Sequence, residues 1–173
     1  KNNLQFCYPS ISNSSKEIFN TNGFDLALAN KLISENLQIV CNDFFLTGKE
    51  RILIVTGPNQ GGKTTFARTF GQLHYFANIG SPVPGSNARL FKFDNLFTLF
   101  ERSEKVEDMK GKLEDDLIRM DSIIKQATSR SIIIINEIFN STTLQDMTIL
   151  SKSIISKLIN KDLFCVWVTF VDE

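Results

Sequence analysis

The amino-acid sequence predicts an α/β domain built around a largely parallel sheet. Short, unbroken apolar runs alternate along the chain with amphipathic helical stretches. One of these runs, "SIIIINE" at 131–137, contains four successive isoleucines. Unbroken β-branched runs are typical of strands buried on both faces, which occur in parallel sheets covered by helices. A length of 173 residues with 42% hydrophobic side chains is sufficient for one domain with a real core.

The strands are predicted from apolar runs bounded by turn residues. Residues 1–36 are polar, rich in Asn and Ser, and are expected to be a flanking segment with a short helix over 23–34. Residues 37–173 are expected to form the main domain, within a piece of a longer protein. The predicted strands are 37–46 with a break at Asn42–Asp43, 51–57, 96–101, 131–137 and 163–170.

The helices are predicted from apolar residues that recur three or four positions apart. Phe66, Phe70, Leu73 and Ala77 place one stripe on a helix over about 63–79. A second stripe, from Leu113 to Ala127, predicts a helix over about 113–128, and a third helix is expected over about 143–159. The segments 80–87 and 102–112 are expected to be loops.

The charge balance, the cysteines and the length of the apolar runs disfavour several classes of protein and of binding site. Lys plus Arg and Asp plus Glu both number 19, so direct DNA binding by this chain is disfavoured. The three cysteines are far apart, which disfavours a disulfide framework or a zinc site and favours a cytoplasmic protein. The single histidine, His74, is expected to be a packed or surface residue. No apolar run reaches the length of a membrane span, so no membrane partner is expected.

The segment "TGPNQGGKTTF" (56–66) contains the phosphate-binding pattern G-x-x-x-x-G-K-[ST], preceded by a predicted strand and followed by a predicted helix. Glycines allow consecutive backbone N–H groups to wrap around a phosphate, and the start of the helix adds partial positive charge. Lys63 is expected to reach the β- and γ-phosphates of ATP, and the Thr64 hydroxyl to bind Mg²⁺. The pattern consists of Gly57, Pro58, Asn59, Gln60, Gly61, Gly62, Lys63 and Thr64.

Hydrolysis needs a further Mg²⁺ partner and a group that orients the attacking water. The end of the "IIIIN" strand supplies Asn136 and Glu137. Asn136 is expected to reach Mg²⁺ directly or through a water molecule, with less attraction than a carboxylate. Glu137 and Lys63 are the predicted catalytic residues, with Glu137 polarising the water. The alternative for Glu137 is an exposed carboxylate at the end of a strand.

Several segments together resemble the MutS family of DNA mismatch repair ATPases. "TGPNQGGKTTF" is similar to the family's TGPNMGGKST, and "VCNDFFL" to its V-P-N-D segment. "ANIGSPVPGSNARLFKFDNLFTLFER" resembles A-x-I-G-x-x-V-P-A…D-x-I-F-T-R. "IIIINEIFNSTTLQD" resembles the family's D-E-L-G-R-G-T-S-T-x-x-D segment after its apolar run. The resemblance covers roughly 37–170 in order.

The resemblance implies an ABC-type P-loop NTPase fold, with ATP or ADP and Mg²⁺ bound in composite sites. It also implies a homodimer in the full-length protein, with DNA contacts possible through regions outside this chain. By motif position, Gly57 to Thr65 would bind phosphates and Mg²⁺, and Ile39 and Asn42 would lie near the adenine. The segment 141–143 and Asp146 would lie near the subunit interface.

The chain departs from the family pattern at three places. Asn136 stands where the family has aspartate, and Phe170 where it tends to have histidine. The segment "GKLEDDLIRM" (111–120) lacks the family's serine, and acidic residues 114–116 are expected where a partner's γ-phosphate would approach. Two functions stay open: a slow ATPase that drives dimer rearrangement, as in DNA mismatch repair proteins, or an ATP-binding dimerisation switch with weak or no hydrolysis and no mismatch recognition.

Overall fold

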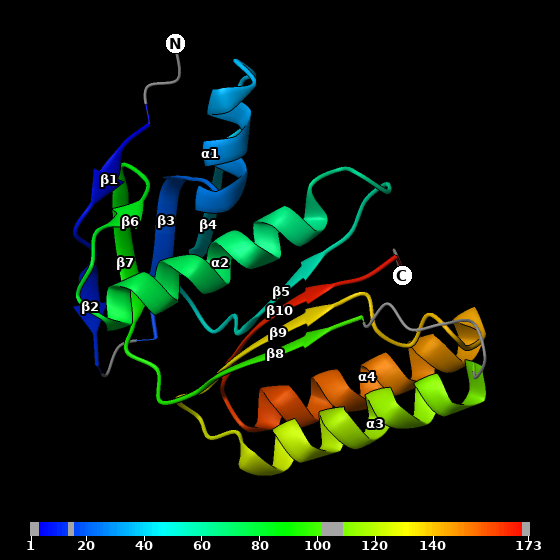
Figure 1. Cartoon of the computed structure of the whole chain (residues 1–173). Coiled ribbons are helices and arrows are strands. Elements are labelled where there is room, and N and C mark those ends of the chain that lie inside the picture. The colour runs from blue at the N-terminus through cyan, green and yellow to red at the C-terminus, as the bar shows by residue number, and fades with distance from the viewer. Residues whose placement is uncertain (1–3, 14–15, 102–108, 171–173) are drawn as a thin grey trace. The chain divides into compact units, whose positions relative to one another are not determined.

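A computed structural model describes residues 4–13, 16–101 and 109–170 of the chain, which form two compact units (Figure 1). Unit 1 comprises Lys1–Glu50 and Thr64–Phe93, and unit 2 comprises Arg51–Lys63 and Asp94–Glu173. Each unit has its own sheet and its own buried residues, and each is described separately below.

Unit 2 contains the predicted parallel sheet. Its four strands lie in the order β5-β10-β9-β8, and all three neighbouring pairs are parallel. The predicted strands over 51–57, 96–101, 131–137 and 163–170 are confirmed, each slightly shorter than expected. The bounds are β5 (Ile52–Val55), β8 (Leu96–Phe100), β9 (Ile132–Asn136) and β10 (Phe164–Val168).

The core of unit 2 lies between this sheet and two helices, α3 (Met109–Gln126) and α4 (Leu144–Asn160). Figure 1 shows the two helices side by side along one face of the sheet. The four isoleucines of β9 are at most 2% exposed, as expected of a strand covered on both faces. Burying each such side chain stabilises the fold by about 1.5–3 kcal/mol.

Unit 1 contains more strands than the sequence predicted. Its four-stranded sheet has the order β2-β7-β3-β4, and a separate ladder joins β1 to β6. Three of these strands lie within 1–36, where the sequence predicted only a short helix, and the predicted loop over 80–87 was wrong because it contains β6 and the start of β7. These strands are short and interrupted by Asn, Ser and Gly, so no apolar alternation marks them. The bounds are β1 (Phe6–Cys7), β2 (Ser10–Ser12), β3 (Ile18–Gly23), β4 (Asn42–Leu46), β6 (Val83–Pro84) and β7 (Asn87–Phe91).

Strand β4 corrects the strand predicted over 37–46. Residues 37–41 are not in a strand, and the expected break at Asn42–Asp43 is where β4 begins. Asn42 pairs with Gly23, and the Asp43 carboxylate accepts a 2.7 Å hydrogen bond from the N–H of Asn22. Asn22 has a left-handed φ of 57°. The polar side chain of Asp43 thus stabilises the neighbouring bend without ending its own strand.

Helix α1 (Leu26–Ser34) confirms the short helix expected over 23–34, and Asp25 caps its start. The Asp25 carboxylate, which is fully buried, accepts hydrogen bonds from the Leu28 N–H at 2.7 Å and from Arg68 Nε at 3.0 Å. Helix α2 (Lys63–Asn78) matches its predicted range closely. Among the residues that the structure describes, no helix combines the length and apolarity needed to cross a membrane.

Helix α3 begins earlier than predicted. Residues 109–112, expected to be loop, form its first turn, and α4 follows its predicted range within one residue. The remainder of the expected charged loop, 102–108, lies outside the described residues.

His74, on α2 within unit 1, is a packed core residue, one of the two alternatives expected for it. Its side chain is fully buried, and its ring centroid lies 4.4 Å from that of Phe70 and 6.4 Å from that of Phe44. Nδ1 lies 2.9 Å from the Phe70 carbonyl oxygen, and Nε2 has no hydrogen-bond partner. Burial lowers the pKa of His74 to about 4, against a small opposing effect of the Phe70 hydrogen bond.

We expect this histidine to make the fold sensitive to acid. Because the folded-state pKa lies below the unfolded value of about 6.5, the stabilisation is complete above pH 6.5 and is lost as the pH falls toward 4. The full loss is about 3 kcal/mol in the free energy of unfolding. Urea unfolding from about pH 7.5 to about pH 4.5 measures it. The non-titrating variant His74→Phe should lose much less over that range; an equal loss in both proteins would contradict the assignment.

Candidate phosphate-binding site

Three parallel strands of unit 2 end at the same edge of the sheet. Val55, Val168 and Asn136 lie in one row across β5, β10 and β9. The segments that follow these strands therefore emerge side by side, and ligands of open parallel sheets bind at such carboxyl edges. The glycine-rich loop follows β5, and Glu137 follows β9. The sequence prediction that both lie at strand ends is confirmed.

The glycine-rich loop adopts a conformation that requires glycine at two positions. Gly57 has φ +137° and Gly62 φ +89°, both in the region that other residues rarely adopt. A Cβ placed on either residue would meet no atom within 4 Å, so the space beside the backbone is open. Gln60 has a left-handed φ of 63°, and the Gly61 N–H donates to the Pro58 carbonyl at 3.1 Å. The loop thus combines positive φ angles with open space beside its backbone at Gly57 and Gly62.

Lys63 ends this loop and begins α2, and its side chain is only 6% exposed. Its ammonium nitrogen donates to the carbonyl oxygens of Gly57 at 2.9 Å and of Pro58 at 3.1 Å. The same nitrogen lies 3.5 Å from Glu137 Oε1. The ammonium group is therefore held inside the curve of its own loop, where it can exchange carbonyl acceptors for more strongly attracting anionic oxygens.

Glu137 comes from a different strand and meets Lys63 at this point. Its side chain is 20% exposed, and its N–H donates to the Val168 carbonyl at 3.0 Å, which extends the sheet by one bond. Its φ of 53° is left-handed, an uncommon and strained conformation for a residue with a side chain. The structure thus brings together the two residues that the sequence nominated as catalytic.

Asn136 is the last residue of β9 and is 6% exposed. Its Oδ1 is buried without a hydrogen-bond partner in the described part of the chain. Leaving a buried amide oxygen unpaired costs about 1–3 kcal/mol, so this atom is suited to accept from a donor such as a metal-bound water. The described residues contain no cluster of three or more His, Cys, Asp or Glu side chains that could hold a metal ion. The unpartnered Oδ1 of Asn136 nevertheless fits a hydrated Mg²⁺.

Phe170 contacts the site in a way that sequence reasoning missed. Lys63 Nζ lies 4.5 Å from the centroid of its ring, a cation–π contact. The sequence marked Phe170 only as a departure from a family histidine. Its place two residues after the end of β10 was the available signal, because β10 ends in register with β5 and β9.

The other predicted site residues have local roles in the structure. Thr64 and Thr65 are the second and third residues of α2, and Asn59 is an exposed member of the loop. Ile39 and Asn42 belong to unit 1, so their place near an adenine stays a prediction. The segment 141–143 leads into α4, where the Thr143 side chain accepts from the N–H of Asp146 at 3.1 Å and caps the helix.

The acidic segment of α3 is not a uniform solvent-facing cluster. Glu114 and Asp115 are exposed, but Asp116 is 3% exposed and its carboxylate accepts a 3.2 Å hydrogen bond from the N–H of Phe139. The expectation that Asp116 would face a partner's γ-phosphate was therefore wrong. The physical reason is helical periodicity, which puts Asp116 on the same inward face as Met120.

Comparison with known proteins identifies the family. Residues 53–173 match MutS domain V. The chain is 28% identical over 168 residues to the DNA mismatch repair protein MutS of Thermotoga sp. (strain RQ2), which covers 94% of the chain and 21% of that relative. It is 34% identical over 117 residues to that of Zymomonas mobilis subsp. mobilis, with 68% of the chain and 14% of the relative covered. The chain spans about a fifth or less of the length of these curated relatives. With the domain V match extending over more than half of its residues, the chain belongs to the MutS family.

Proposed function

We propose that this chain is an ABC-type P-loop ATPase domain that binds ATP with Mg²⁺ and hydrolyses it. The observation that carries the proposal is the meeting of Lys63 and Glu137, 3.5 Å apart, at the mouth of an open glycine loop. A cation for phosphate oxygens and a carboxylate for a water molecule are the two side chains that phosphoryl transfer needs beside a backbone cradle.

Each residue has a role set by its chemistry. The N–H groups of the loop from Gly57 to Gly62 bind phosphate oxygens, and the Lys63 ammonium binds the β- and γ-phosphates. The Thr64 hydroxyl and, through water, Asn136 would hold Mg²⁺, which would supply positive charge to the phosphates. Glu137 accepts a proton from the water that attacks the γ-phosphate and orients that water.

Substrate binding changes the partners of Lys63. The carbonyl oxygens of Gly57 and Pro58 are neutral acceptors, whereas phosphate oxygens are anionic and attract the ammonium more strongly. Transfer of Lys63 to the phosphates also leaves the Glu137 carboxylate free to bind water. The resting contacts thus keep both side chains in place before the substrate arrives, which lowers the reorganisation needed for reaction.

For the full-length protein we propose that this ATPase drives rearrangement of a homodimer. The relatives are DNA mismatch repair proteins by name, and their greater length leaves room for DNA-binding regions outside this chain. The zero net charge of the chain also disfavours direct DNA binding by this part of the protein.

A second function, an ATP-binding dimerisation switch with weak hydrolysis, is favoured by two observations. Asn136 is neutral where the family pattern has an aspartate, so it attracts Mg²⁺ less. The ring of Phe170 lies 4.5 Å from Lys63 Nζ, which gives the ammonium an additional partner that competes with phosphate. Both features lower the rate of ATP hydrolysis more than they change the glycine-rich loop that binds phosphate.

The variant Asn136→Asp tests the metal role of this position. We expect it to tighten Mg²⁺-dependent ATP binding, or to raise turnover, by about three- to tenfold, because a carboxylate attracts a hydrated cation more strongly than an amide does. Binding after chelation of Mg²⁺ should not tighten. Isothermal titration and phosphate-release assays with and without Mg²⁺ measure both quantities. Asn160→Asp adds the same charge at the exposed end of α4 and should change neither; equal behaviour of the two variants would contradict a metal role for Asn136.

A further inference from the structure

We propose that Asp116 of α3 is a positioning residue for Glu137: it fixes the backbone of the segment that carries the Glu137 carboxylate. The proposal rests on the proposed function, in which Glu137 orients the attacking water. Asp116 accepts from the Phe139 N–H and pairs with Arg119, so its proposed effect on Glu137 runs through the segment that follows β9.

The segment after β9 has a strained backbone. Glu137 has φ 53° and Phe139 φ 65°, both left-handed, although neither is glycine. Such a conformation persists only where surrounding contacts impose it, and strain of this kind concentrates at functional sites. Without those contacts, the backbone at Glu137 and Phe139 would relax toward ordinary φ values and turn the Glu137 side chain to another direction.

Hydrogen bonds from two backbone N–H groups contribute to this conformation, beside those that the Glu137 carbonyl oxygen accepts from Asn140 Nδ2 at 2.8 Å and the Phe139 carbonyl oxygen accepts from the Thr142 N–H at 3.3 Å. The N–H of Glu137 donates to the Val168 carbonyl at 3.0 Å, and the N–H of Phe139 donates to Asp116 Oδ2 at 3.2 Å. The side chains of Ile138 and Phe139 are 3% and 0% exposed and anchor the segment in the core of unit 2. Of the two N–H anchors, the one from Asp116 depends on a side chain, and it lies two residues from Glu137.

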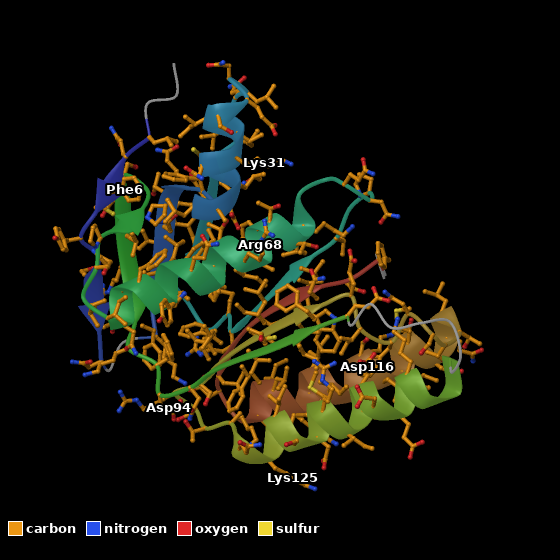
Figure 2. All side chains as sticks on the ribbon, viewed as in Figure 1. Phe6, Lys31, Arg68, Asp94, Asp116 and Lys125 are labelled. Carbon is orange, nitrogen blue, oxygen red and sulfur yellow. The ribbon has the colours of Figure 1, made fainter. Side chains whose placement is uncertain are left out.

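The surroundings of Asp116 suit this role. The residue, labelled in Figure 2, lies on α3 with a side chain only 5% exposed. Its Oδ1 lies 3.7 Å from Arg119 Nη1, a cation that also lies 3.9 Å from Asp115 Oδ2. Burying a carboxylate on the inner face of a helix is costly unless a donor and a countercharge compensate it, and the Phe139 N–H and Arg119 supply both. An apolar residue could pack there at lower cost but could not accept the hydrogen bond from Phe139.

The test uses the full-length protein with Asp116→Leu, which removes the acceptor, and Asp116→Asn, which keeps an oxygen acceptor of the same reach. We expect Asp116→Leu to lower kcat by about tenfold or more, with ATP affinity within about twofold of the parent. Asp116→Asn should retain most of the kcat. Hydrogen exchange at the Phe139 amide should quicken in the leucine variant and stay slow in the asparagine variant. Asp121→Leu is the matched control on the exposed face of the same helix, where the carboxylate pairs with Lys125, and it should leave kcat and exchange unchanged.

Combining Asp116→Leu with Glu137→Gln shows whether Asp116 acts by positioning Glu137 or whether its loss damages the fold in general. There, Asp116→Leu should lower the residual kcat no further, because the group it positions is already disabled. Unchanged kcat and unchanged Phe139 exchange in a folded Asp116→Leu protein would overturn the proposal, as would an equal loss of kcat in the Glu137→Gln background. If Asp116→Leu does not fold, Asp116→Ser, which cannot reach Phe139, takes its place with the same expected results. If the parent itself hydrolyses no ATP, the proposed function fails, and exchange at Phe139 still decides whether Asp116 holds the segment.

Discussion

Replacement of Lys63 by alanine is expected to abolish ATP hydrolysis and to weaken ATP binding by at least about a hundredfold. The ammonium lies in a nearly closed position with two carbonyl oxygens, the Glu137 carboxylate and the Phe170 ring around it. In the bound state it would make charge-assisted hydrogen bonds to phosphates, each worth about 1.5–3 kcal/mol. Alanine leaves those phosphate oxygens to the loop N–H groups alone, and a loss of about 2.7 kcal/mol corresponds to a hundredfold in affinity.

Titration with a fluorescent ATP analogue measures this loss, and thermal unfolding of the same samples checks that the fold is intact. Lys157→Ala, which removes an exposed lysine from α4, is the matched control and should bind as the parent does. Lys63→Arg should also bind poorly, because the planar guanidinium does not fit the two carbonyl oxygens that hold the ammonium. Parent-like affinity in Lys63→Ala would show that the loop does not use this cation for phosphates.

Glu137→Gln is expected to separate binding from hydrolysis. The amide keeps the size of the carboxylate but accepts no proton, so single-turnover hydrolysis should fall by about a hundred- to a thousandfold. ATP affinity should stay unchanged or rise a few-fold, because a negative charge beside the phosphates has been removed. Phosphate release from a single turnover and nucleotide titration measure the two effects independently.

Glu101→Gln is the control for this change. Glu101 follows Phe100, which pairs with Asn136, so it also stands at the carboxyl end of a parallel strand. Its carboxylate binds Lys112 and the side chain of Asn140, whereas the Glu137 carboxylate pairs with Lys63. The control should therefore turn over ATP within about twofold of the parent. If Glu137→Gln turned over ATP as fast as the parent, Glu137 would be an ordinary carboxylate at the end of a strand with no catalytic role.

Much of unit 2 was predictable because its two central strands, β9 and β10, are buried on both faces. An unbroken run such as Ile132 to Ile135 has no polar residue that would mark an exposed side, so its assignment needs no tertiary information. The places of the glycine-rich loop after β5 and of Glu137 after β9 followed from the same runs. Unit 1 resisted prediction because its strands are short and carry residues such as Asn20, which is fully buried and donates to the Pro84 carbonyl across the sheet. That partner is 64 residues away in the sequence, and local patterns do not reveal it.

The candidate site also has parts that the sequence predicted and parts that only the tertiary structure reveals. The motif located the cradle, but the contact of Phe170 with Lys63 depends on the register between β5 and β10. Asp116 is different, because its inward position was available in the sequence. It lies three residues after Leu113 and four before Met120, on the stripe that was used to predict the helix. The charge of the acidic run alone predicts an outward position for Asp116, whereas the helical periodicity predicts the inward position that the structure has.

We propose above all that the loop from Gly57 to Lys63 binds ATP in a Mg²⁺-dependent way. Its most direct test is isothermal titration of the full-length parent and Lys63→Ala with ATP, each in the presence of Mg²⁺ and after its chelation. The proposal predicts saturable binding by the parent that weakens on chelation and is lost, with Mg²⁺ present, in Lys63→Ala. Absence of saturable binding in the parent, or equal binding by both proteins, would contradict it.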